Sequence, residues 1–384
     1  MLREVQRIIR ADAGIVVLLA EANTGSSRSA DIADSFGAVG HVRAMHAACH
    51  QTIGRSSEAS QPSIVTLECP PEAAGAGTAT ILCAPVKTQD ITWGALILGR
   101  SAGQPEFTAA GGRLAMALAH QAAIAMETAR LHREELKKQR LEEELAIGRQ
   151  IQLSLLPKGY PVIPGWEFVT VYEPARQVGG DFYDLYPLPG APVRLSLVVA
   201  DVTGKGIPAA LLMAFSRTIM RSESTGGGGP ARTLRRANRA IVHDIRSSLF
   251  LSACCATLDT RTGTLVYASG GHDPPLWFRA ETGGTRWLSA RGFVLGAFPE
   301  VKPEECATDL GPGDLLVFYT DGVTEARGPS RDLFGEERLR ATVEAHARGG
   351  AGRPNRALVG ELEAFTAGTP QSDDLTLLIV SRQA

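Results

Sequence analysis

The stretch VGGDFYDLY, Val178 to Tyr186, sets two glycines directly before two carboxylates that lie among aromatic residues. A turn explains one glycine and one aspartate, so this stretch alone is weak evidence for a site. Three later segments also place an aspartate at the edge of an apolar strand: VVADVTGKG (198–206), VFYTDGVTEA (317–326) and PQSDDLTLLIV (370–380). Since strand ends from distant parts of a chain can meet, we expect these carboxylates to form one cluster.

Clustered carboxylates point to a particular chemistry. Hard divalent cations such as Mg²⁺ and Mn²⁺ prefer oxygen ligands and keep several bound waters. Two such ions, roughly 3.5–4 Å apart, can activate a water and hold a phosphoryl group in line with it. The four acidic segments therefore predict two divalent cations, Mn²⁺ or Mg²⁺, between which the sequence does not choose.

The order of the segments carries a family resemblance. GGDFYD, ADVTGKGIPAALLMA, YTDGVTEA and SDDLTLLIV resemble, in that order, the motifs of the SpoIIE/RsbU-type branch of the PPM (PP2C-like) serine/threonine phosphatases. Between them, FLSACCATLDTRTGTLVYASGGHDPP and GFVLGAF are similar to the family's strand pair with a His-x-Pro turn and to its Gly-x-x-Leu-Gly segment. The resemblance runs from about Glu142 to Val380. It implies an α+β domain over residues 158–384, a PPM-type β-sandwich flanked by helices.

The resemblance also implies site residues. The catalytic metal ligands, acting through a metal-activated water, would be Asp181, Asp201, Asp321 and Asp373, joined by the backbone carbonyl of Val202. Four neighbours would support them, with the glycines allowing close approach of the backbone: Asp374, Asp184, Gly180 and Gly322. For Asp184 two roles stay open, orienting the ligands or simply holding a turn.

Two residues keep alternative interpretations, and one turn departs from the family pattern. His272 could be a general acid for the leaving seryl oxygen, or a structural residue that pins its turn, which we favour because no partner is visible in the sequence. Lys205 could meet the substrate phosphate or lie exposed in a turn. Ser269 stands where the family has asparagine, and Ser252 where relatives commonly have threonine; neither change removes a ligand.

The N-terminal part resembles a GAF sensor domain over residues 1–125. Strands are expected at GIVVLLA (14–20), PSIVTLE (62–68), ATILCAPV (79–86) and WGALILGR (93–100), followed by a long helix with Ala-Ile-Ala-Met. Its ligand stays unknown, and such domains also serve only in dimerisation. Six residues could be ligands, although no second cluster completes a metal or haem site: His41, His46, Cys49, His50, Cys69 and Cys83.

A helical linker is expected over residues 126–157, because HREELKKQRLEEELAIGRQIQLSLLP is rich in helix formers and ends at Pro157. Ile124, Leu131 and Leu145 share a heptad position that Lys138 interrupts. The pattern favours a short, imperfect coiled coil and a homodimer through this helix. A solvated connecting helix in a monomer is the alternative.

Composition excludes several classes of protein. The formal net charge of -2 gives no basic field for nucleic acid. No Cys-x-x-Cys pair occurs among the six cysteines, which indicates reduced thiols in a cytoplasmic protein. The longest apolar run near the start, Gly14 to Ala20, is too short to span a membrane, and no signal peptide is recognisable.

The sequence therefore predicts a metal-dependent protein serine/threonine phosphatase regulated by a sensor domain. By family analogy alone, its substrate would be a phosphorylated STAS-type anti-sigma-factor antagonist in bacterial signalling or stress response. A scaffold that binds a phosphoprotein without turnover is the alternative outside enzymes. A diguanylate cyclase, suggested by Gly-Gly-Asp-Phe, would need an acidic residue in place of Phe182.

Overall fold

The computed structural model describes residues 7–19, 30–36, 63–68, 78–101, 103–189, 191–245 and 248–384. The chain divides into two compact units, Met1–Arg140 and Leu141–Ala384. This boundary falls inside the segment 126–157 that the sequence predicts as a linker. Five of the six candidate ligands of the sensor, His41, His46, Cys49, His50 and Cys69, lie outside the described residues, whereas Cys83 is buried.

The first unit contains one antiparallel sheet in the order β2-β1-β5-β4-β3. Its strands are β1 (Ala13–Leu19), β2 (Ala30–Phe36), β3 (Ser63–Glu68), β4 (Thr78–Lys87) and β5 (Thr92–Arg100). Four of them confirm the predicted strands. The edge strand β2 was missed because ADIADSF lacks an apolar run, and its Ile32 is 40% exposed.

Helix α3 (Ala109–Leu155) is continuous over 47 residues, as its helix-forming composition predicts. In the first unit its small residues Ala115, Ala119 and Ala123, four apart, pack with Leu82 and other leucines of the sheet. Farther along, Ile124 and Leu131 are about half exposed.

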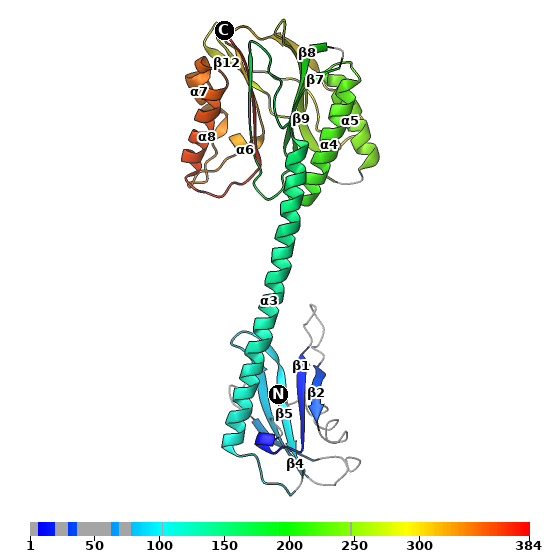
Figure 1. Ribbon diagram of the computed structural model, residues 1–384, viewed down its shortest axis with the longest axis vertical. Helices are drawn as coiled ribbons and strands as arrows, with labels where there is room; N and C mark the ends of the chain where they lie inside the picture. The colour runs from blue at the N-terminus through cyan, green and yellow to red at the C-terminus, as the bar shows by residue number, and fades with distance from the viewer. Residues whose placement is uncertain are drawn as a thin grey trace. The chain divides into compact units, whose positions relative to one another are not determined.

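The second unit is a sandwich of two five-stranded antiparallel sheets, β13-β10-β9-β8-β7 and β12-β11-β14-β15-β6 (Figure 1). We call them the first and the second sheet. The strands are β6 (Trp166–Glu173), β7 (Phe182–Leu188), β8 (Ala191–Val202), β9 (Leu251–Asp259), β10 (Thr264–Gly270), β11 (Leu276–Arg279), β12 (Gly284–Trp287), β13 (Glu305–Asp309), β14 (Leu315–Tyr319) and β15 (Leu375–Arg382).

Helices cover the outer face of each sheet (Figure 1). Helices α4 (Ile207–Thr225) and α5 (Pro230–Asp244) contact the first sheet, and α7 (Gly335–His346) and α8 (Gly352–Thr366) contact the second. Two short helices, α6 (Asp321–Thr324) and η1 (Ala347–Gly349), complete the unit. This arrangement confirms the predicted α+β sandwich flanked by helices.

Burial on both faces explains why the central strand of the second sheet, β14, is almost wholly apolar. In β14, Leu316 and Phe318 face the core shared with the first sheet, whereas Leu315, Val317 and Tyr319 face the core under α7 and α8. Strand side chains alternate between faces, so a strand covered on both sides has no position for a polar residue. The polar residues collect instead where the strands end, and the candidate site lies there.

Candidate active site

Asp181 lies immediately before β7 and is almost fully buried, at 1% exposure. Its Oδ2 accepts hydrogen bonds from Thr320 Oγ1 at 2.6 Å and from Thr376 Oγ1 at 2.8 Å. Both threonines belong to the second sheet or its ends, so Asp181 joins the two sheets. Burial raises the pKa of Asp181 well above its usual value, and the charge of Asp201 adds to this, while the threonine hydroxyls act against it.

The Gly-Gly pair is required by close packing. A Cβ on Gly180 would lie 2.7 Å from the carbonyl oxygen of Val202, and one on Gly179 would lie 2.4 Å from Asp374 Oδ2. A Cβ on Gly322 would lie only 1.9 Å from the carbonyl oxygen of Asp374. No larger residue fits at these positions without moving backbone or carboxylate, so the glycines let three loops meet at the carboxylates.

Asp374 holds the loop that leads to Asp181. Its Oδ2 accepts a hydrogen bond from the backbone N–H of Gly180 at 2.6 Å, and its Oδ1 accepts one from Ala175 at 2.7 Å. The loop is also held from helix α3, where Gln152 both donates to the carbonyl of Gly179, at 2.6 Å, and accepts from its N–H, at 3.1 Å. Asp374 thus contacts this loop through backbone N–H groups.

The remaining three carboxylates face the same space. Asp201 lies at the end of β8, Asp321 begins α6 directly after β14, and Asp373 lies in the loop before β15. Burial raises the pKa of Asp321 to about 7, and the charges of Asp201 and Asp373 contribute to the rise. Burial also raises the pKa of Asp201, with the charges of Asp373 and Asp374 acting in the same direction.

This donor set fits divalent cations by its chemistry, since it offers only oxygen ligands and accumulates negative charge that a cation would neutralise. As the side chains stand, no three acidic, histidine or cysteine residues of the described ranges form a ready metal-binding group. Two ligand candidates already have partners: Asp181 has its threonines, and Asp373 has Lys205, whose Nζ lies 2.8 Å from Asp373 Oδ2.

The structure places Asp184 elsewhere. In β7 its side chain shares a face with Phe182 and points toward α4, where it forms ion pairs with Arg217 at 3.0 Å and Arg221 at 3.3 Å. Because strand residues alternate, this face is opposite to that of Tyr183. Asp184 therefore anchors α4 to the sheet, and its contacts give no support to the expected role of orienting the metal ligands.

His272 occupies a structural position. Its Nε2 donates to the carbonyl oxygen of Tyr319 at 3.0 Å, so in the neutral ring Nδ1 accepts a hydrogen bond from Ser252 Oγ at 2.7 Å. Burial lowers the pKa of His272 to about 4. Ser269, which replaces the family's asparagine, accepts a hydrogen bond from the backbone N–H of His272 at 3.0 Å. The turn is thus pinned as the structural interpretation expects.

Sequence reasoning missed Thr320, Thr376 and Gln152. The two threonines lie inside the motifs Tyr-Thr-Asp-Gly and Asp-Asp-Leu-Thr. Because threonine is common in strands, nothing in the sequence distinguished them from ordinary strand residues. Phe182 is fully buried in the core, so the position that a diguanylate cyclase needs for an acidic residue is here a packing residue.

Comparison with known proteins agrees with this geometry. Residues 191–383, half of the chain, match the family described as "Stage II sporulation protein E (SpoIIE)". The chain belongs to the SpoIIE family. Residues 1–126 match the GAF domain. Both matches confirm the resemblances seen in the sequence, a PPM-type phosphatase domain preceded by a GAF domain.

Curated relatives of the SpoIIE domain include "Phosphoserine phosphatase RsbU" of Bacillus subtilis, 28% identical over 248 residues, which are 64% of this chain and 72% of RsbU. "Protein IcfG" of Synechocystis is 29% identical over 269 residues, 62% of this chain. The chain spans only 41% of the length of IcfG.

Two solved structures share the fold. The PP2C domain of SiaA from Pseudomonas aeruginosa superposes with a TM-score of 0.57 at 22% identity, covering 65% of this chain and 99% of that one. The RsbU and RsbW domains of a Mycobacterium tuberculosis protein superpose with a TM-score of 0.50 at 30% identity, covering 59% of this chain and 62% of that one. No helix within the described ranges has the length and apolarity to cross a membrane.

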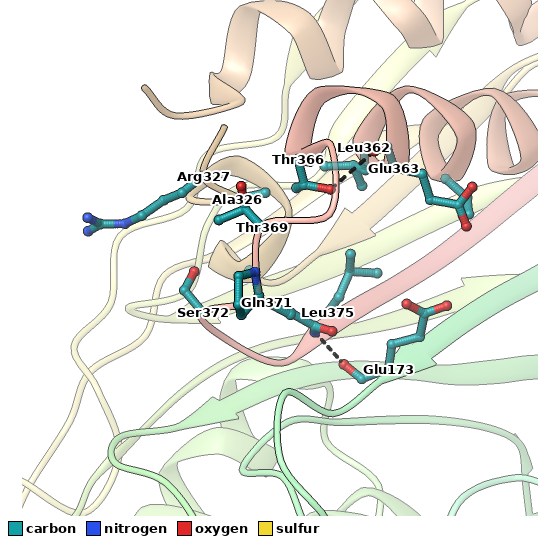
Figure 2. Close-up of a pocket in the computed structure, with 13 residues that line it drawn as sticks. Glu173, Ala326, Arg327, Leu362, Glu363, Thr366, Thr369, Gln371, Ser372 and Leu375 are labelled. Carbon is teal, nitrogen blue, oxygen red and sulfur yellow. Dashed lines mark hydrogen bonds between the residues drawn. The ribbon is translucent and has the colours of Figure 1, made fainter. Parts of the chain in front are cut away.

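A pocket of about 100 Å³ opens in the SpoIIE domain (Figure 2). Gly322 and Ser372, the neighbours of Asp321 and Asp373, both line it. Leu362 and Leu375 give it apolar lining, and Gln371 closes one side by donating a hydrogen bond to the carbonyl of Glu173 at 2.8 Å. A side chain next to a reacting group could enter this pocket.

Proposed function

We propose that this protein is a metal-dependent phosphoserine/phosphothreonine protein phosphatase regulated by its GAF domain. One observation supports the proposal: Asp181, Asp201, Asp321 and Asp373 all lie at strand ends of the two sheets, and burial together with neighbouring carboxylates raises the pKa of Asp181 and of Asp321. Buried carboxylates without a matching cation are costly to the fold and are typical of functional sites.

Two divalent cations, Mn²⁺ or Mg²⁺, would be held by these four carboxylates and the carbonyl of Val202. When bound, such ions supply a water of lowered pKa and neutralise charge on the phosphoryl group. The protein's own residues fix the ligands: the hydroxyls of Thr320 and Thr376 orient Asp181, and Asp374 fixes the backbone at Gly180. His272 uses both ring nitrogens within the fold, so it does not serve as the general acid.

The substrate we propose is a phosphorylated STAS-type antagonist of an anti-sigma factor, in a bacterial signalling or stress-response pathway. The similarity to RsbU, a phosphoserine phosphatase by its name, supports a phosphoprotein substrate. The pocket of Figure 2 would receive the side chain beside the phosphoserine. We further propose a cytoplasmic homodimer formed through α3, with a small-molecule ligand of the GAF domain still to be identified.

The test is release of phosphate from a phosphoserine peptide by the chain of residues 1–384, with Mn²⁺ or with EDTA. We expect activity that requires the metal and falls at least about 100-fold in Asp321→Ala, because a ligand of the metal-activated water is lost. The control is Asp332→Ala, an exposed carboxylate of the same region whose distant contact with Arg338, at 3.9 Å, is expendable.

The same samples also test the alternative, a scaffold that binds a phosphoprotein without turnover. If the protein were such a scaffold, the wild type and Asp321→Ala would both bind the phosphopeptide, and neither would release phosphate. If the wild type bound the phosphopeptide in the presence of Mn²⁺ but released no phosphate, the scaffold would be the correct function and the phosphatase proposal would be wrong.

A further inference from the structure

Lys205 lies in the loop 203–206, which leads from the candidate ligands Asp201 and Val202 into helix α4. Gly204 and Gly206 flank it with φ of 90° and 79°, a left-handed backbone that favours glycine. Thr203 fixes the start of the loop, since its backbone N–H donates to the carbonyl of Phe250 at 2.9 Å and its Oγ1 accepts from the N–H of Phe250 at 3.1 Å. The backbone therefore fixes where Lys205 leaves the loop.

The ammonium group of Lys205 contacts the loop that precedes β15 of the second sheet. It donates to Asp373 Oδ2 at 2.8 Å and also to the carbonyl oxygen of Ser372. One lysine thus contacts the candidate metal ligand Asp373 at the end of the second sheet, and it lies in the loop that directly follows the candidate ligand Asp201 of the first sheet.

This ion pair contributes little to the stability of the fold. Both side chains are well exposed, at 38% for Lys205 and 37% for Asp373, and exposed ion pairs are weak because water screens them. A lysine held by such a pair can leave it easily. A divalent cation, with twice the charge and a preference for carboxylate oxygen, would compete successfully for Asp373.

We propose that Lys205 is a displaceable counter-ion of the metal centre, which gives up Asp373 to the cation and then binds the phosphate group of the substrate. The inference rests on the proposed phosphatase function and adds a positioning residue to it. Released from Asp373, the ammonium stays at the mouth of the site, because its loop is fixed. A phosphate dianion that approaches the cations from solvent would pass beside it.

The proposal predicts opposite changes in metal affinity and in phosphate affinity when the charge of Lys205 is removed. A merely structural role of Lys205 would not produce opposite changes. Removing the charge should strengthen metal binding, since a competitor for Asp373 disappears, and should weaken phosphate binding, since a donor disappears. A lysine that only tied the two loops together would, on removal, weaken the binding of metal and substrate alike.

The experiment uses the chain of residues 1–384 with Lys205→Gln, Lys205→Arg and, as a matched control, Lys302→Gln on an exposed residue. Binding of Mn²⁺ without substrate is measured by the electron paramagnetic resonance of free Mn²⁺, and KM and kcat are measured on a phosphoserine peptide. For Lys205→Gln we expect Mn²⁺ binding about two- to fivefold tighter, the range of an exposed ion pair, and a KM raised by a similar factor. Lys205→Arg and Lys302→Gln should stay close to the wild type.

Unchanged or weaker Mn²⁺ binding in Lys205→Gln overturns the proposal, and so does an unchanged KM. Failure of the phosphatase function itself looks different. In that case the wild type would not bind Mn²⁺, or Asp321→Ala would bind it as well as the wild type does, whatever the lysine variants show.

Discussion

Asp181 and Asp184 lie three residues apart in one stretch of sequence, and both are almost fully buried, at 1% and 2% exposure. Their surroundings are opposite. Asp184 faces two arginines of α4, Arg217 and Arg221, which offset its charge. Asp181 faces two neutral hydroxyls and other carboxylates, and no basic side chain of the described ranges forms an ion pair with it.

The difference separates a carboxylate that serves the fold from one that serves a site. A buried charge with matched partners is satisfied within the protein, and losing one partner is destabilising. A buried carboxylate surrounded by like charges is tolerated only where it does something else, such as binding a cation. The two surroundings therefore predict opposite effects for the same change of Asp to Asn.

The largest effect is expected for Asp181→Asn on activity. The change leaves the side chain's shape intact but removes the charge that would hold the metal and the activated water, so kcat should fall by about 100- to 1000-fold. Because a repulsive buried charge disappears, the unfolding free energy measured with denaturant in EDTA should stay equal or rise. A large loss of stability would show that Asp181 is structural.

Asp184→Asn should reverse this pattern. Arg217 would be left buried without its carboxylate, and we expect a loss of about 2–4 kcal/mol in the unfolding free energy, somewhat below a fully buried pair because Arg221 is half exposed. Mn²⁺ binding should be unchanged at a temperature where the variant is folded. Weaker Mn²⁺ binding by the folded variant would show that Asp184 supports the metal centre.

Much of the fold could be predicted from the sequence, because its strands are long and apolar and its acidic motifs occur in a specific order. The contacts of each polar side chain could not be predicted. For Asp184 the sequence left two roles open, orienting the metal ligands or holding a turn, and it did not show the ion pairs with Arg217 and Arg221 of α4. The threonines that orient Asp181 were missed because the contact spans 139 and 195 residues of chain.

The cluster of carboxylates should also make the stability of the protein depend on pH. Burial raises the pKa of Asp321 from 3.8 to about 7 in the folded protein. The folded state then holds a proton on Asp321 that the unfolded state has lost, so this group makes the stability without metal fall as the pH rises from about 4 to about 7. His272, whose pKa burial lowers to about 4, acts in the opposite direction, so the variant Asp321→Asn isolates the contribution of Asp321. Saturating Mn²⁺ should remove this fall by favouring the ionised carboxylates.

Thermal unfolding at pH 5 and pH 7.5, in EDTA and in Mn²⁺, measures this dependence. Asp321→Asn in EDTA should show a smaller fall than the wild type, because one of the raised groups is gone. If Asp321→Asn in EDTA showed the same pH dependence as the wild type, burial would not be raising the pKa of Asp321 in the folded protein.

The smallest effect is expected for Ser252→Ala, which examines His272 at the edge of the same site. Ser252 donates to the Nδ1 of His272, while the Nε2 of His272 holds the carbonyl of Tyr319, directly before Thr320 and Asp321. Losing one neutral hydrogen bond should cost about 1 kcal/mol of unfolding free energy, and kcat should change less than twofold, since the second bond still positions the strand end. Ser252→Thr, which restores the hydroxyl found in relatives, is the control and should keep the stability of the wild type. A different outcome would contradict this: a large loss of kcat in Ser252→Ala, with a shifted pH profile and unchanged stability. It would show that His272 takes part in proton transfer. The buried neutral histidine would then be a catalytic residue rather than a structural one.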